Sequence, residues 1–393
     1  MFEPLRPVTV RAVEIVTVPM QPIRPLRTAR GSSAPREVLL VHVRAEEAEG
    51  WAEVAVEPAP TYASEFTAEA RLVLAEHLVP LAWAGPTGDG TALASHLARI
   101  RGHHAARAAL ELAVLDAQLR AEGRALADWL GVTPDQAAVG VPAGAALGLP
   151  RAAHDVSELL AEADEALAAG AARLRVKVAP GVAAAPLRSL RAHLGDAVAL
   201  QVDANGSFRL DDADHLDELR ALDEVGLACI EQPLAPDDLV GHAHLATLLH
   251  TPICLDEPLT SVGALEAAAA LGACAVVCCK PGRVGGWPAA RRFLSRSAEL
   301  GLGAWVGGMH ESAIGRAANL ALAATLVDTE GALAPDLDPR GRFDPDLDDP
   351  RLPAPGPGTR RVAVPSGPGV GAAPPPSLLV GAGVDVLISR EPR

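Results

Sequence analysis

Five short segments between positions 173 and 282 each carry an apolar run to a charged residue just before a turn signal. The segments RLRVKV, LQVDAN, CIEQP, CLDEP and CCKPG supply Lys177, Asp203, Glu231, Asp256 and Lys280. If the runs are parallel strands of a β/α barrel, their carboxyl ends converge on one pocket. Carboxylate oxygens suit a hard cation such as Mg²⁺, and a lysine near a divalent cation can act as a base near neutral pH. The pattern therefore predicts an enzyme site for metal-assisted proton abstraction.

A structural interpretation competes with this one. Residues 173–177 could be an edge strand whose polar face carries Arg175 and Lys177, and Asp203 could cap the next helix. Asn205 lies on the same strand face as Asp203. Cations that face a barrel interior are costly unless carboxylates or an anionic ligand compensate for them. Four further charged strand ends at regular spacing favour the catalytic interpretation.

Neighbouring residues are expected to support the site. Asp256 adjoins Glu257, and alternation lets only one of them point inward, so we assign Asp256 as a ligand and give Glu257 an orienting role. The loop after the seventh predicted strand has two glycines, which permit close approach of the backbone to a ligand. Its candidate site residues are Gly307, Gly308, Met309 and Glu311.

The composition bounds the class of protein. The 393 residues are 49% hydrophobic and 21% charged, which suits a globular chain long enough for two domains. A net charge of −15 argues against nucleic-acid or anionic-membrane partners. The five cysteines lack CxxC spacing, and we see neither a signal-peptide profile nor a membrane span. We expect free thiols and a cytoplasmic protein.

A change of pattern divides the chain. Strand-like runs and then helical patterns come first: 8–20, 36–45 and 50–57, then 64–84 and 92–122. They predict an α+β domain over residues 1–133. Eight strand-like runs alternate with helices over residues 134–345, the count for a (β/α)8 TIM-type barrel, and the last run is ALAPDLDP (332–339). Residues 346–393, rich in Pro and Gly, are predicted to return onto the first domain.

Taken in order, these segments resemble a known family. The KxK-like strand, VDAN, IEQP, LDEP, KPGRVGG and GGMHESAIGRAAN are similar to motifs of the enolase superfamily, muconate-lactonizing-enzyme subgroup. Within it the likeness is to o-succinylbenzoate synthases and N-acylamino acid racemases. The stretches PTYASEF, GHHAARAALELAVLDAQLRA and PSGPGVGAAP extend the resemblance over nearly the whole chain. It implies a barrel covered by an α+β capping domain that the C-terminal segment completes.

The resemblance also implies roles. Three carboxylates match ligands of Mg²⁺, for which Mn²⁺ can substitute: Asp203, Glu231 and Asp256. Lys177 matches the second lysine of KxK, a base on one face of the substrate, and Lys280 matches the lysine on the opposite face. Arg175 replaces the first lysine and keeps its charge. The chemistry implied is removal of a proton α to a carboxylate, through an enediolate.

The loop 21–33 departs from the family pattern. It carries Arg24, Arg27 and Arg30 where relatives present apolar and small residues, and it resembles the specificity-setting flap of the capping domain. We expect Arg27 and Tyr62 to contact the distal end of the substrate, because the barrel supplies little apolar surface there. The arginines either favour a more anionic substrate or are solvated loop charges, and both interpretations stay open.

Three functions follow as expectations. The first is an Mg-dependent o-succinylbenzoate synthase of menaquinone biosynthesis, a syn-dehydration in which Lys177 removes the α proton and Lys280 stabilises the enediolate. The second is an N-succinylamino acid racemase in which the two lysines act as two bases. The third is a catalytically inactive ligand-binding homologue, against which the retained charged positions argue. A metal hydrolase would want histidine ligands, which these positions lack. The expected partners are a small carboxylate substrate and further copies of the chain in a homo-oligomer.

Overall fold

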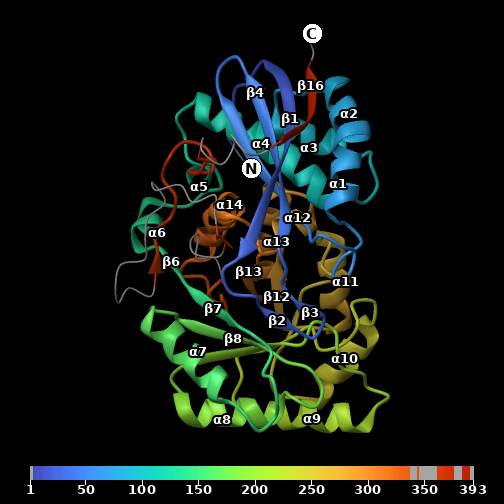
Figure 1. Cartoon of the computed structure of the whole chain (residues 1–393), viewed down its shortest axis with the longest axis vertical. Coiled ribbons are helices and arrows are strands. Elements are labelled where there is room, and N and C mark those ends of the chain that lie inside the picture. The colour runs from blue at the N-terminus through green and yellow to red at the C-terminus, as the bar shows by residue number, and fades with distance from the viewer. Residues whose placement is uncertain (1–2, 337–342, 345–360, 376–382, 390–393) are drawn as a thin grey trace.

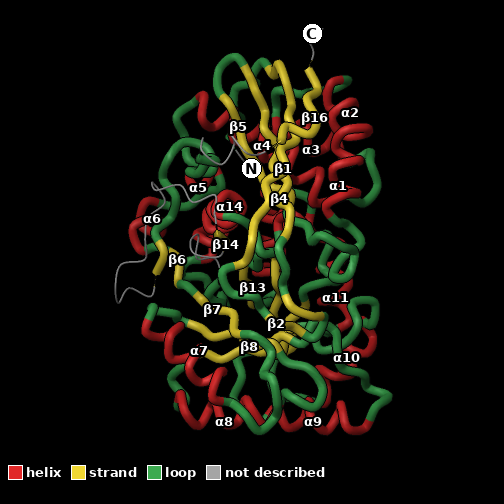
Figure 2. The backbone as a smooth tube through the Cα atoms, in the orientation of Figure 1, coloured by secondary structure: helices red, strands yellow, loops and turns green. Residues whose placement is uncertain are grey.

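The computed structural model of the chain describes residues 3–336, 343–344, 361–375 and 383–389. A sheet with helices stands at the top of Figure 1, and a curled parallel sheet ringed by helices lies below it. Figure 2 shows the long strands of the upper sheet running down toward the lower one. No helix among the described residues combines the length and the apolarity needed to cross a bilayer.

The upper sheet is an antiparallel meander with strands added from the C-terminal segment. Strand β1 (Val10–Pro22) pairs with β4 (Arg36–Ala45), which forms a hairpin with β5 (Glu49–Val54). The free side of β1 pairs with β14 (Phe343–Asp344) and β16 (Gly383–Ser389), both antiparallel. The predicted return of the C-terminal segment therefore takes the form of strands on the β1 edge.

Helices follow this sheet in the chain. They are α1 (Thr67–Val73), the π-helical turn η1 (Leu74–Leu78), α2 (Val79–Trp83), α3 (Gly90–Leu97), α4 (His104–Ala121), α5 (Leu126–Trp129) and α6 (Pro134–Val139). Of these, α4 and α1 pack against the sheet. The helical pattern predicted over 92–122 is split between α3 and α4. Helix α3 ends at Leu97, and Gly102 and His103, just before α4, have positive φ of 66° and 49°, which a continuous right-handed helix does not allow although the apolar spacing continues.

The lower sheet has seven parallel strands in sequence order, each followed by helix. The strands are β7 (Gly144–Leu147), β8 (Arg173–Lys177), β9 (Ala199–Asp203), β10 (Ile230–Glu231), β11 (Ile253–Leu255), β12 (Val276–Cys279) and β13 (Gly303–Val306). The helices are α7 (Ser157–Ala168), α8 (Ala184–Leu194), α9 (Ala213–Asp223), α10 (Leu239–Leu248), α11 (Val262–Leu271), α12 (Pro281–Val284), α13 (Trp287–Glu299) and α14 (Ala313–Ala323), which ends in the 3₁₀ turn η2 (Ala324–Leu326). A separate short pair joins β6 (Val141–Pro142) to β15 (Arg361–Val362).

The eighth predicted strand closes the ring without being a regular strand. Leu333 donates its backbone N–H to Ala304 of β13 at 3.1 Å, and the Pro335 carbonyl accepts from Gly144 of β7 at 2.8 Å. Residues 332–336 thus span the gap between the first and last strands, but Pro335 lacks a donor and interrupts the ladder. Residues 337–339 of the predicted run lie outside the described residues. The predicted barrel-and-cap architecture is confirmed, whereas the domain boundaries at 133 and 345 stay predictions.

Candidate active site at the carboxyl ends of the barrel strands

The five charged strand ends meet at one end of the barrel, facing the capping domain. They are Lys177 on β8, Asp203 on β9, Glu231 on β10, Asp256 just after β11 and Lys280 just after β12. None of the five is more than 7% exposed. Strand register makes Lys177 a neighbour of Asp203, and Asp203 a neighbour of Glu231. Buried charges persist only where opposite charges and hydrogen bonds compensate for them.

One half of the site is organised by Asp203. Lys177 Nζ donates to Asp203 Oδ2 at 2.5 Å and to Asn205 Oδ1 at 3.0 Å. Arg175, two residues earlier on the same strand face, donates to Asp203 Oδ2 and lies 3.2 Å from Glu231 Oε2. The cation at position 175 therefore contacts two of the three clustered carboxylates.

The other half is organised by Asp256. Lys280 Nζ donates to Asp256 Oδ2 at 2.8 Å, and the Tyr62 hydroxyl donates to the same oxygen at 2.6 Å. Arg283 of α12 donates to the other carboxylate oxygen of Asp256 and to its backbone carbonyl. The sequence interpretation missed Arg283. The available signal was its place three residues after Lys280 in KPGRVGG, close to one helical turn on.

These contacts shift the pKa values of the carboxylates in opposite directions. Burial and the nearby Asp203 carboxylate raise the pKa of Glu231 to about 8. Burial also acts on Asp256, but Arg283 and Lys280 outweigh it and hold the pKa of Asp256 far below its usual range. Burial of Lys280 is likewise outweighed, by Asp256 and Tyr62, so the pKa of Lys280 is raised well above its usual value. The raised pKa of Glu231 thus reflects, besides burial, the repulsion between neighbouring carboxylates of the cluster.

The arginine loop reaches the barrel at two places. Arg27 donates to the Leu149 carbonyl at 3.0 Å and to Glu158 at 2.9 Å, and so fixes the loop to the segment around α7. The contacts described for Arg27 are thus with protein groups beside the mouth. Arg30 donates to the Asn205 carbonyl at 3.0 Å and lies 3.6 Å from Glu257 Oε1.

Arg30 also lies over the Tyr62 ring, 5.4 Å from its centroid. Glu257 is the buried carboxyl that Arg30 approaches. Its own burial, and then the charge of Asp256, raise the pKa of Glu257 to about 7. Arg30, Tyr62 and Glu257 therefore bring the capping domain onto the barrel mouth.

The loop after β13 contains an internal hydrogen bond. Glu311 Oε2 accepts from the backbone N–H of Met309 at 2.7 Å, and Gly308 and Met309 are half-buried. We predicted that glycines here let a ligand approach. A Cβ on Gly307 would lie 2.4 Å from Cys278 Sγ and 3.0 Å from Lys280 Cε, so this glycine makes room for protein side chains.

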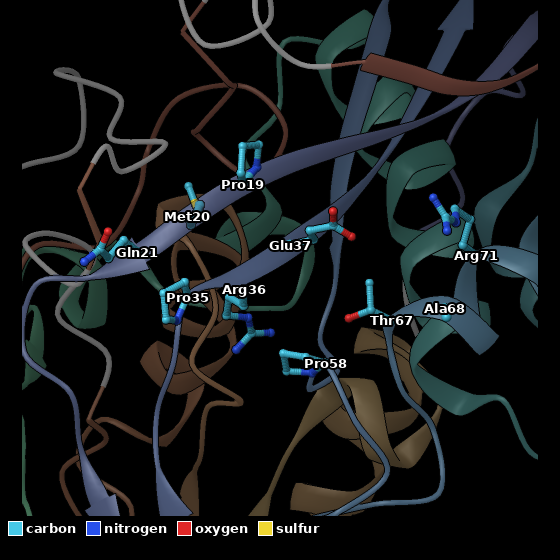
Figure 3. A pocket seen from close by; sticks show the side chains of 10 residues that line it. All are labelled: Pro19, Met20, Gln21, Pro35, Arg36, Glu37, Pro58, Thr67, Ala68 and Arg71. Atoms are coloured by element: carbon cyan, nitrogen blue, oxygen red, sulfur yellow. The ribbon is translucent and has the colours of Figure 1, made fainter.

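A cavity of about 590 Å³ lies in the capping domain, away from the five charged residues. It is lined from β1, β4, α1 and the adjacent loops by Pro19, Met20, Gln21, Pro35, Arg36, Glu37, Pro58, Thr67, Ala68 and Arg71 (Figure 3). Arg36 donates to the carbonyls of Met309 and His310, both at 3.3 Å. The cavity therefore backs onto the loop after β13, but it has no part in the charged cluster.

Comparison with known proteins identifies the family. Residues 158–377 match the model described as "Enolase C-terminal domain-like", and residues 11–131 match the mandelate racemase/muconate lactonizing enzyme N-terminal domain. The chain belongs to the enolase superfamily. An N-succinylamino acid racemase from Amycolatopsis is 40% identical over 368 residues, 93% of this chain and 95% of the relative. An o-succinylbenzoate synthase from Geobacillus stearothermophilus is 39% identical over 299 residues, which are 76% of this chain and 77% of the relative.

A solved structure of an enolase-superfamily member from Listeria innocua superposes with a TM-score of 0.86 at 29% identity, covering 97% of this chain and 99% of that one. The superfamily predicted from the motifs and the prediction of an enzyme are therefore confirmed. These relatives are named for the two activities that the resemblance led us to expect.

Members of the enolase superfamily bind a divalent metal, and this member has a possible acidic site for one. Ligand atoms of Glu231, Asp256 and Cys278 all lie within 4.8 Å of one another, and all three residues are buried. Asp203, the third predicted ligand, is outside this group, and its Oδ2 accepts from Lys177 and Arg175. The donor set fits a divalent cation.

The buried carboxylate of Glu53, on β5 of the capping domain, contacts the start of α14. It accepts from the Ser312 hydroxyl at 2.6 Å, from the Ser312 backbone N–H at 2.9 Å and from the Gly315 N–H at 3.3 Å. Burial, and then the charge of Glu311, raise the pKa of Glu53 to about 7. The first turn of α14 is thereby linked to a group that titrates near neutral pH.

Glu53→Gln is expected to change how stability depends on pH. Between pH 4.5 and about 7 the folded wild type keeps the Glu53 proton that the unfolded chain has lost. The wild type therefore loses stability as pH rises through this window, on the order of 3 kcal/mol, whereas the glutamine variant lacks this loss. Urea unfolding at several pH values measures it, with the exposed Glu37→Gln as control. Parallel pH profiles for wild type and Glu53→Gln would contradict the prediction.

Proposed function

We propose that the chain is an Mg²⁺-dependent o-succinylbenzoate synthase. The observation that carries the proposal is that two buried lysines contact two different carboxylates of one cluster. Lys177 contacts Asp203, and Lys280 contacts Asp256. A substrate carboxylate bound at the cluster would have one amine on each side, as abstraction of an α proton and stabilisation of the resulting charge require.

In this proposal Asp203, Glu231 and Asp256 hold Mg²⁺, with Mn²⁺ able to substitute. The cation would polarise the substrate carboxylate and so acidify the α proton. Lys177 accepts that proton. Lys280, which Asp256 and Tyr62 hold in its ammonium form against the effect of burial, stabilises negative charge. The capping domain excludes water through Tyr62, which is hydrogen-bonded to Asp256.

The second candidate is racemisation of N-succinylamino acids, favoured by the relative of that name at 40% identity over 93% of this chain. It requires the same cluster but needs Lys177 and Lys280 to exchange the roles of proton donor and acceptor. We further propose a small carboxylate substrate, a homo-oligomeric state and a cytoplasmic location.

Proton NMR in deuterium oxide with Mg²⁺ tests both candidates. The panel is the hydroxylated precursor that yields o-succinylbenzoate on loss of water, and a set of N-succinylamino acids of both configurations. Formation of the aromatic product supports the synthase. Exchange of the α proton with inversion supports the racemase. A protein that binds the panel but neither exchanges protons nor forms product would be the inactive ligand-binding homologue.

Arg30→Ala is expected to change the ranking of substrates. Arg30 reaches the mouth at Asn205, Glu257 and Tyr62, so its loss alters the wall beyond the carboxylate cluster. We expect ratios of kcat/KM between panel members to shift by about tenfold or more, with metal affinity unchanged. Arg24→Ala is the matched control, because Arg24 pairs with Glu165 in an exposed bridge of the same loop. Unaltered constants across the panel would make Arg30 a solvated loop charge.

A further inference from the structure

A thiol lies beside the carboxylates of the candidate site. Cys278 is two positions before Lys280 on β12, so both side chains point to the inside of the barrel. Cys278 Sγ, one oxygen of Glu231 and one oxygen of Asp256 lie within 4.8 Å of one another. Sulfur and oxygen ligands around one Zn²⁺ are separated by about 3–4 Å, so a small contraction would bring these three onto a single ion.

The Cys278 thiol is buried beside Gly307. Cys278 has 0% exposure, and a Cβ on Gly307 would lie only 2.4 Å from its sulfur, so glycine leaves the sulfur its space. Weak contacts to carbonyl oxygens are found for the thiols of Cys254 and Cys279, but no hydrogen bond is found for that of Cys278 within the described part of the chain. The thiol is thus a buried polar group directed at two carboxylates.

The other cysteines lack this setting. Cys229, Cys254 and Cys278 share an apolar cluster with Val276 and Trp305, but the sulfurs of Cys229 and Cys254 are not among the potential metal ligands found in the described residues. Cys279, next to Cys278 on the same strand, points to the opposite face, where its sulfur is 4.0 Å from the Ala290 carbonyl. In the described structure only the thiol of Cys278 joins two carboxylates in a group of potential metal ligands.

We propose that Cys278, with Glu231 and Asp256, forms a binding site for a thiophilic divalent cation of the Zn²⁺ or Cd²⁺ class. This inference rests on the proposed function to the extent that Glu231 and Asp256 also serve the hard cation there. On binding, the thiol proton passes to solvent and a sulfur–metal bond forms. Thiolate favours soft and borderline cations over Mg²⁺. A zinc ion held in this way occupies two carboxylates that Mg²⁺ needs, so it inhibits the enzyme.

Titration of the full chain with Cd²⁺ tests the site without turnover. The protein is first freed of metal by a chelator and kept reduced, and the ultraviolet charge-transfer band of a thiolate–cadmium bond is followed. We expect one band that saturates at one Cd²⁺ per chain and that excess Mg²⁺ suppresses. Cys278→Ser should lose the band and bind Cd²⁺ about tenfold or more weakly. Cys279→Ala, the same residue type on the other face, should keep both.

Two results would overturn the proposal. One is an unchanged band in Cys278→Ser, which would place the sulfur ligand elsewhere. The other needs no cysteine variant: excess Mg²⁺ leaves the wild-type band unchanged, and Asp256→Asn shows the same band as the wild type. The site requires the Asp256 carboxylate, so both changes should weaken the band. The band is read without substrate. If the protein shows the band but does not exchange the α proton, the proposed function is wrong and the thiol site stands. If it exchanges the α proton but shows no band, the thiol site is wrong and the proposed function stands.

Discussion

Lys177→Ala is expected to lose α-proton exchange by about a thousandfold or more, the upper part of the range for removal of a general base. The side chain is 6% exposed, and its Nζ lies 2.5 Å from Asp203 Oδ2 and 3.0 Å from Asn205 Oδ1, so its position is fixed. No other lysine contacts Asp203. The measurement is loss of the α-proton signal in deuterium oxide, with Mg²⁺ binding followed by calorimetry to show that the metal site survives.

Lys280→Ala is the informative comparison for this variant. If the reaction is dehydration, Lys177→Ala should be the more damaging change, because Lys280 stabilises charge without removing the proton. If the reaction is racemisation, each variant should still exchange the α proton of one enantiomer and lose that of the other. A Lys280→Ala enzyme with the full dehydration rate would remove the role proposed for Lys280. A Lys177→Ala enzyme with normal exchange would show that the base lies elsewhere.

Asp336→Ala should produce the largest loss of stability, about 3–5 kcal/mol. Asp336 Oδ1 accepts from Arg173 at 2.8 Å and Oδ2 from Arg175 at 2.6 Å, and the side chains of both arginines are largely buried. Removing the carboxylate leaves two guanidinium groups inside the barrel without their shared partner. Chemical denaturation measures the change, and Asp336→Asn keeps the shape while removing the charge.

The control for Asp336 is Asp211→Ala. Asp211 also pairs with an arginine, Arg209 at 2.7 Å, but both side chains are about two-thirds exposed or more, at 70% and 68%. Exposed pairs of this kind contribute little to stability, so no measurable change is expected. A loss for Asp336→Ala no larger than that for Asp211→Ala would mean that the two arginines find other partners or water.

Much of the barrel and of the charged cluster could be predicted because the relevant signals are local. Period-two alternation and a following turn signal mark each strand end, and a parallel barrel brings such ends together. Arg283 and Asp336 carry no such signal. Arg283 lies in a four-residue helix whose letters PGRV indicate a turn, and Asp336 follows a proline in a segment that is not a regular strand.

The split between α3 and α4 escaped prediction for a related reason. Apolar spacing continues through Gly102 and His103, whereas the backbone leaves the helix after Leu97 and has positive φ at these two residues before α4 begins. The predicted contact of Arg27 with the substrate stays a prediction, because a loop's position along the chain does not determine where one long side chain points. Its described contacts are with Leu149 and Glu158.

The pairing of β1 with β16 has a consequence for how the chain is made. β1 is complete after 22 residues, but its partner on one side is not synthesised until residue 389. At about 5–20 residues per second, the ribosome leaves that edge of a 13-residue strand unpaired for about 20–70 s. An unpaired edge of this length is a template for association with other nascent chains. Prolines at positions 19 and 22 protect only its far end, so we expect this protein's yield in cells to depend on chaperone supply more than that of a barrel whose cap is built from one end of the chain.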